Sequence, residues 1–310
     1  MDRKQTYSIA LISISLLSLE LIWTRVLAAE FFYTFAFLVL SLAVLGLGMG
    51  ALSLRLFPRL ESSHSIGLNL LLGGFMMLVG PPAVYRLGMK FSTLPGSFAM
   101  LGKLILVILI LSSAFYFCGI ALAILFKRNH AQIRQMYMAD LLGAGLGVII
   151  ALITMNTLST PVAAFVISLP IFLAAGINTK GNYRILPLIM MLFALIAGLN
   201  SDVLLKSAKP DRAPVIYEHW DAMAQIKMFA YPDDEARGMV IDNAANTPVY
   251  KFDGDYSLPD SGAEDLWGIP VGDLIDRFES CRFLSLGSGG GADVLQALAE
   301  GATEVHAVEV

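Results

Sequence analysis

The residues best suited to chemistry form a glycine-rich run near the carboxyl end of the chain. Gly287-Ser288-Gly289-Gly-Gly291 follows an apolar segment, 282–286, and precedes a helical pattern over 292–300. Glycine has no Cβ, so it permits a tight turn and lets a ligand approach the backbone closely. Glu309 lies 22 residues after Gly287 in a second apolar segment, where a carboxylate accepts hydrogen bonds from ribose hydroxyls. The spacing predicts a cofactor site formed by Gly287, Ser288, Gly289, Gly291 and Glu309.

The glycine spacing fits two classes of cofactor. Gly287-x-Gly289-x-x-Ala292 satisfies the dinucleotide fingerprint, and Gly287-x-Gly289-x-Gly291 satisfies the pattern of S-adenosylmethionine-type sites. Spacing alone leaves both open. No catalytic residue is identified, and the four scattered histidines predict no metal site.

The composition divides the chain into two regions. Hydrophobic residues make up 56% and charged residues 15%, against about 45–50% and 25% in soluble domains. Residues 1–200 hold 13 Lys and Arg against 5 Asp and Glu, whereas residues 201–310 hold 8 against 20. This asymmetry predicts a membrane region and a water-soluble region. The acidic region argues against a nucleic-acid partner, which requires clustered basic residues.

Residues 1–200 predict a polytopic helical bundle whose partner is the lipid bilayer. A spanning helix needs about 20 mostly apolar residues, and seven stretches approach this length: 7–29, 31–54, 66–85, 104–126, 139–158, 161–177 and 185–200. With the amino terminus in the cytoplasm, nine basic residues of the terminus and loops also face inward, as the positive-inside rule prefers.

This orientation conflicts with a cytosolic cofactor, because seven crossings would put residues 201–310 outside. A segment that does not span, an eighth segment within 86–103, or an amino terminus outside would remove the conflict. We expect a multi-pass protein of the cell (inner) membrane with a cytoplasmic soluble part.

Two features of the bundle predict helix contacts. Glycines at 46, 48 and 50 and at 143, 145 and 147 favour close helix packing, with a substrate path as the alternative. Glu20, Arg25 and Asp140 lie at or near membrane depth, where an ionised group needs a partner. We predict that Arg25 pairs with Asp140 across helices.

The soluble part is predicted in three pieces. Residues 201–212 form a linker. Residues 213–280 form a small β-rich unit, because short apolar runs at 215–217, 226–229 and 239–241 alternate with turn residues at 232–234 and 253–255. Residues 281–310 form the first strand, helix and strand of a Rossmann-like α/β domain. Two strands and one helix cannot cover a parallel sheet, so we expect the chain to end inside this domain and to be inactive alone.

Four segments then form an ordered pattern: Glu20-Leu-Ile-Trp23-Thr24-Arg25, the glycine run 45–50, the segment from Met136 to Gly147, and the cofactor loop from Gly289 to Leu295. This order resembles that of the membrane-embedded members of the spermidine synthase-like (polyamine aminopropyltransferase-like) family. The resemblance covers most of the chain. It implies a membrane-anchored transferase of polyamine biosynthesis that uses decarboxylated S-adenosylmethionine, or S-adenosylmethionine itself, with a small-molecule amine as substrate.

The chain departs from the family pattern at two places. Soluble members carry an aspartate in the loop, near the cofactor's amine, where this chain has Gly290, and they carry a Tyr-His-Glu or Tyr-Gln-Glu run where this chain has 265–270 without it. Cofactor binding therefore carries over better than polyamine recognition, and the family's catalytic aspartate would lie beyond Val310. Two alternatives stay open: a membrane methyltransferase that uses S-adenosylmethionine, and a transporter or scaffold with a regulatory nucleotide-binding domain.

Overall fold

A computed structural model of the chain describes residues 3–31, 34–62, 65–89, 97–206, 211, 213–230, 236–252, 271, 275 and 280–309. Several sequence predictions lie outside these residues: the turns at 232–234 and 253–255, the segment 265–270, and Val310. The chain divides into two compact units. The first holds residues 1–210 together with 220–224, and the second holds 211–219 together with 225–310.

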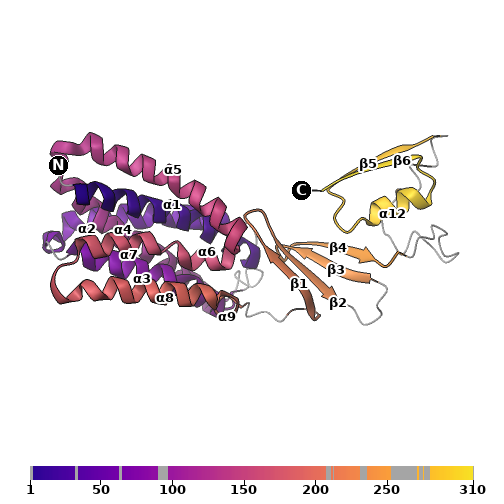
Figure 1. The fold of residues 1–310 in the computed structure, drawn as a ribbon. Helices are drawn as coiled ribbons and strands as arrows, with labels where there is room; N and C mark the ends of the chain where they lie inside the picture. The colour runs from indigo at the N-terminus through magenta and orange to yellow at the C-terminus, as the bar shows by residue number, and fades with distance from the viewer. Residues whose placement is uncertain are drawn as a thin grey trace. The chain divides into compact units, whose positions relative to one another are not determined.

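Apolar helices build the first unit, as the hydropathy pattern predicts (Figure 1). Six spans within the described residues are long and apolar enough to cross a membrane, so this part of the chain is a multi-pass membrane bundle. The helices are α1 (Arg3–Phe31), α2 (Thr34–Leu56), α3 (Ser65–Arg86), α4 (Phe98–Arg128), α5 (Ile133–Leu158), α6 (Thr160–Val166), α7 (Leu169–Asn178), the shorter α8 (Ile185–Leu199) and the single turn α9 (Ser201–Leu204). Each of the seven predicted stretches contains a described helix, and the sixth contains both α6 and α7.

The amino terminus and the end of α8 lie at opposite ends of the bundle. Asn178, the last residue of α7, donates its side-chain amide to Ser8 Oγ of α1 at 2.8 Å, so both residues lie at one end. α8 returns along α6, because a Cβ on Gly198 would lie 3.6 Å from a methyl group of Val162. The chain therefore leaves the bundle at the end opposite to residue 8 (Figure 1).

The end of α3 and the start of α4 lie close together. Lys103, near the start of α4, donates to the carbonyl of Leu87, just after the end of α3, at 2.7 Å. A spanning segment between these described residues would separate them by about 30 Å. The alternative of an eighth segment within 86–103 is therefore wrong. Six described spans are long enough to cross a membrane, and α8 (Ile185–Leu199) is a further, shorter apolar helix.

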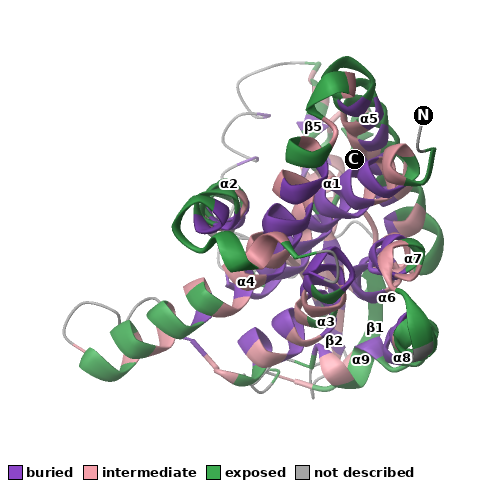
Figure 2. Cartoon of the chain, turned by 90° about the vertical axis from the view of Figure 1, so that its left-hand side faces the viewer, coloured by how far each residue is buried: buried purple, intermediate pink, exposed green. Residues whose placement is uncertain are grey.

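Glycines allow two helix pairs to approach closely, which confirms the predicted packing for Gly46, Gly50, Gly143 and Gly147. Gly48 and Gly145 meet nothing within 4 Å and do not take part. A Cβ on Gly143 would lie 2.5 Å from the carbonyl oxygen of Ala10, and a Cβ on Gly147 would lie 2.7 Å from that of Ile14. Gly46 of α2 approaches α4 equally closely, with Ser112 O at 2.6 Å from a Cβ. Figure 2 shows the buried residues on the helix sides that face one another and the exposed residues on the outside. Backbone approach of this kind is how helices associate in lipid.

Asp140 contacts a serine instead of Arg25. The hydroxyl of Ser13 in α1 donates to the Asp140 carboxylate. Arg25 lies 12 residues after Ser13 in the same continuous helix, which is about 18 Å along the helix axis at 1.5 Å per residue. The predicted pairing of Arg25 with Asp140 is therefore wrong, because the two residues lie at different depths in the bundle.

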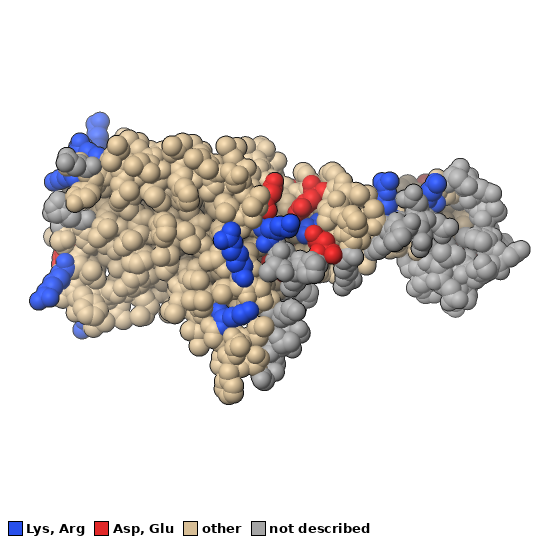
Figure 3. Space-filling view, turned by 90° about the horizontal axis from the view of Figure 1, so that it is seen from below, with Lys and Arg blue, Asp and Glu red and all other residues tan. Residues whose placement is uncertain are grey.

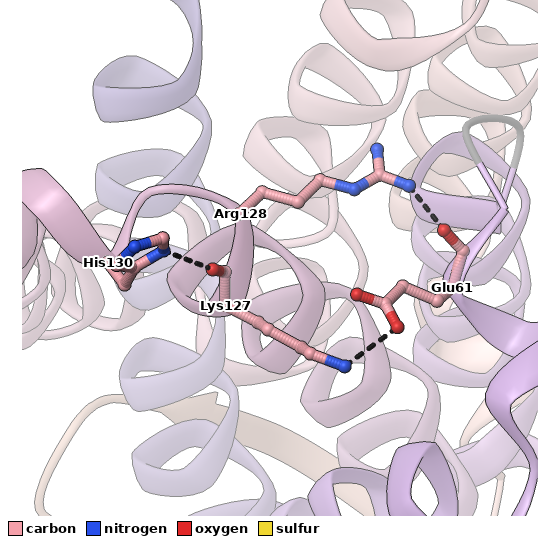
Figure 4. A network of polar contacts seen from close by, with 4 residues as sticks. All are labelled: Glu61, Lys127, Arg128 and His130. Atoms are coloured by element: carbon pink, nitrogen blue, oxygen red, sulfur yellow. Dashed lines mark hydrogen bonds and ion pairs between the residues drawn. The ribbon is translucent and has the colours of Figure 1, made fainter.

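Figure 3 shows basic side chains at both ends of the bundle, among them the end that holds the amino terminus. There Lys127 donates to the Glu61 carboxylate at 2.7 Å, and Arg128 donates to the Glu61 carbonyl (Figure 4). These contacts tie the end of α4 to the short 3-10 helix η1 (Pro58–Glu61) after α2. On the face seen in Figure 3 the side wall of the bundle carries no charged side chain between its two ends, as contact with hydrocarbon requires.

The second unit begins with a four-stranded sheet in the order β1-β2-β3-β4. The strands are β1 (Val215–Trp220), β2 (Gln225–Ala230), β3 (Ala236–Ile241) and β4 (Ala245–Tyr250), and β3 pairs antiparallel with both of its neighbours. The first three contain the predicted apolar runs. The sequence prediction missed β4, whose Asn, Thr and Pro residues give no apolar signal; Pro248 is tolerated because β4 is an edge strand among the described residues.

A strand–helix–strand segment completes the described part of the second unit. β5 (Arg282–Leu286) pairs in parallel with β6 (Glu304–Val308), and α12 (Ala292–Ala299) connects them. The helix buries Ala297 against Val271 and Ile275, with Phe283 and Val305 packed alongside. The predicted strand, helix and strand are confirmed, with the second strand ending before Glu309.

Candidate functional site

The glycine run forms the turn between β5 and α12. Gly287, Gly289 and Gly291 have φ angles of 77°, 54° and 79°, which lie in the left-handed region where side chains with a Cβ are strained. The turn is held at its start by the N–H of Gly287, which donates to the Val308 carbonyl at 2.8 Å. The backbone path itself therefore requires the three glycines.

Glu309 lies directly beside this turn. The N–H of Gly289 donates to Glu309 Oε2 at 2.5 Å. A carboxylate has two oxygens and about four lone pairs, so this bond leaves Oε1 for the hydroxyl groups of a ligand. Glu309 follows the last residue of β6 and is exposed. The carboxyl ends of two parallel strands therefore bring the glycine turn and the acidic residue together, where ligands of open α/β sheets bind.

Ser288 adds a polar atom that the protein itself does not satisfy. Its Oγ is buried and has no hydrogen-bond partner among the described residues. A buried hydroxyl without a partner is unfavourable, and a ligand with a polar group at this turn would supply the missing bond. The structure thus brings together all five predicted site residues: Gly287, Ser288, Gly289, Gly291 and Glu309.

Strand β4 packs against the same turn, which the sequence did not predict. The N–H of Gly290 donates to Thr247 Oγ1 at 3.1 Å, and a Cβ on Gly290 would overlap the carbonyl oxygen of Pro248. These contacts join residues 43 positions apart, so no local pattern indicates them. With the backbone as it stands, no side chain therefore fits at position 290.

A second carboxylate near the turn is already engaged. The hydroxyl of Ser285 on β5 donates to Asp293 in the first turn of α12. This contact ties the strand to the helix that follows the turn. It gives Asp293 a structural part in the site and leaves Glu309 as the exposed acidic group at the turn.

Comparison with protein families, with curated proteins and with solved structures finds no match to this chain. The geometry of the turn and the sequence motifs are therefore what indicates the function.

Proposed function

We propose that the protein is a membrane-anchored, spermidine synthase-like transferase that binds decarboxylated S-adenosylmethionine or a related adenosyl cofactor. One observation carries the proposal: Glu309 lies against the left-handed glycine turn that joins a strand to a helix. The four ordered sequence motifs support the same family. The strand–helix–strand segment would then be part of a Rossmann-like domain.

Each site residue has a role that follows from its chemistry. The glycine turn would admit the adenosyl part close to the backbone, and Ser288 Oγ would gain the hydrogen-bond partner that it lacks. Glu309 Oε1 would accept hydrogen bonds from the ribose. Transfer from a sulfonium compound is a nucleophilic displacement at the carbon next to sulfur, so the protein must position the amine and remove its proton. None of the five site residues is assigned as that base.

Thr247 and Pro248 bear on the choice of reaction. They leave no room for a side chain at Gly290, the position that resembles the family's loop aspartate. S-adenosylmethionine carries its own carboxylate beside its amine and so depends less on an aspartate from the loop. The missing aspartate therefore favours the methyltransferase alternative as the second candidate. The transporter alternative would need Glu20, Arg25 and Asp140 to share one aqueous cavity, whereas Asp140 contacts Ser13 far from Arg25.

The proposal includes a cytoplasmic soluble part in a multi-pass protein of the cell (inner) membrane, because adenosyl cofactors are made in the cytosol. Since residue 8 and the end of α8 lie at opposite ends of the bundle, the amino terminus would then face outward. The positive-inside rule favours the reverse orientation. Membrane topology is therefore a severe test of a cytosolic cofactor.

Substitution of Glu309 tests the proposed site. In the full chain reconstituted in nanodiscs, Glu309→Ala should weaken calorimetric binding of decarboxylated S-adenosylmethionine by about 10- to 100-fold, because hydrogen bonds to a charged group contribute about 1.5–3 kcal/mol. Glu304→Ala is the matched control, since Glu304 is exposed at the start of β6, the strand that Glu309 follows, and pairs with His306. Equal affinities for the two variants would contradict the assigned role of Glu309.

A further inference from the structure

The turn between β1 and β2, residues 220–224, packs with the membrane bundle as part of the same compact unit. Ala222 packs against the buried core of the bundle. Its N–H donates to Asn156 Oδ1, near the end of α5, at 3.0 Å. The hydroxyl of Thr160, fully buried at the start of α6, donates to the Asp221 carbonyl at 2.6 Å. Two hydrogen bonds and an apolar contact thus fix the turn to the corner between α5 and α6.

The turn is also rigid by itself. Asp221 Oδ1 accepts hydrogen bonds from the N–H groups of Met223 and Ala224 at 2.7 and 2.8 Å, and the N–H of Asp221 donates to the Ala224 carbonyl at 3.1 Å. With its backbone held in this way, the turn leaves the Met223 side chain 72% exposed. An apolar side chain held exposed at this place calls for a partner.

The length of α5 locates the turn relative to the bilayer. The span His130–Leu158 has 29 residues, which corresponds to about 43 Å, whereas the hydrocarbon core is about 30 Å thick. The ends of this span therefore reach into the headgroup region. Asn156 lies two residues before the end of α5, so the residues bound to it lie at the boundary between membrane and water, the zone that tryptophan side chains favour.

We propose that the 220–224 turn is a membrane-interface anchor whose partner is the phospholipid headgroup layer, which receives the apolar side chains of Met223 and Trp220. Asn156 and Thr160 hold this turn at the bilayer surface. This inference depends on the bundle alone and holds whatever ligand the glycine turn binds.

Depth-dependent fluorescence quenching tests the anchor. The full chain with Met223→Cys, in a Cys281→Ser background, carries an environment-sensitive label at position 223. The remaining cysteine, Cys118, is fully buried. Ala244→Cys, in the turn between β3 and β4, is the matched control because it is an exposed hairpin tip. In phosphatidylcholine nanodiscs, nitroxide lipids labelled near the headgroup should quench the label at 223 more strongly than the label at 244. Equal quenching at the two positions would overturn the proposal.

A second variant separates the anchor from general stability. Asn156→Ala combined with Thr160→Val removes both hydrogen bonds to the turn. The label at 223 should then lose its additional quenching, while the helical circular dichroism of the bundle stays unchanged. Retained quenching in this variant would show that the two bonds do not hold the turn at the membrane. If the variant does not fold, the comparison of positions 223 and 244 still decides.

Discussion

Replacing Gly143 by alanine should separate α1 from α5. The new methyl carbon would lie 2.5 Å from the carbonyl oxygen of Ala10 and 3.0 Å from its Cα, whereas a carbon and an oxygen in favourable contact are about 3.3–3.6 Å apart. The two backbones must therefore move apart by roughly 1 Å at this point, a form of overpacking that costs about 1–3 kcal/mol. Because the obstructing atoms are backbone, no rotamer change relieves the clash.

Gly145→Ala provides the matched control in the same helix. A Cβ on Gly145 meets nothing within 4 Å, so this variant adds a methyl group without a clash and gains up to about 1 kcal/mol of helix propensity. Gly147→Ala should resemble Gly143→Ala, since its Cβ would lie 2.7 Å from the Ile14 carbonyl oxygen.

The assay is equilibrium unfolding in mixed micelles of a mild detergent and dodecyl sulfate, followed by circular dichroism. The expected destabilisation raises the unfolding equilibrium constant by about 5- to 150-fold for Gly143→Ala and Gly147→Ala, with no loss of stability for Gly145→Ala. Three variants of equal stability would refute the close approach of α1 and α5.

Two further predictions concern the bundle. A double-mutant cycle of Ser13→Ala with Asp140→Asn should give a coupling energy of about 0.6 kcal/mol and at most about 1.7 kcal/mol, the average and the maximum for hydrogen bonds between membrane helices. The cycle of Arg25→Gln with Asp140→Asn should give no coupling energy. Coupling in this second cycle would restore the Arg25–Asp140 pair. Lys4→Cys and Lys206→Cys, in a background without native cysteines, should react with an impermeant maleimide from opposite sides of the membrane. The transferase proposal expects the cytoplasmic side for residue 206, and labelling of residue 206 from outside intact cells would contradict a cytosolic cofactor.

Local patterns in the sequence predicted the helices and the glycine turn well. Each membrane helix is a long apolar run, and the turn depends on Gly287, Gly289 and Gly291 within five residues, so both signals are local. The Gly46 and Gly143 contacts were also predictable, because small residues gather where helices touch. For these features, residue type and spacing are the physical cause of the structure.

Contacts between distant segments were harder to predict. Arg25 and Asp140 were paired by their opposite charges. Helices that start at the same end of a bundle, however, bring together only residues of similar depth. Arg25 lies 22 residues into α1, whereas Asp140 lies 7 residues into α5. Counting residues from each helix start would have excluded the pair. The approach of Thr247 to the glycine turn has no such signal, because it depends on how β4 packs.

The most direct test of the proposed function is calorimetry of the full chain in nanodiscs with three cofactors: decarboxylated S-adenosylmethionine, S-adenosylmethionine and NAD. The glycine spacing admits both adenosyl sulfonium compounds and dinucleotides, so the three ligands separate the readings of the site. The proposal predicts saturable binding of an adenosyl sulfonium compound that Glu309→Ala weakens. Binding of NAD alone, or of none of the three, would contradict it.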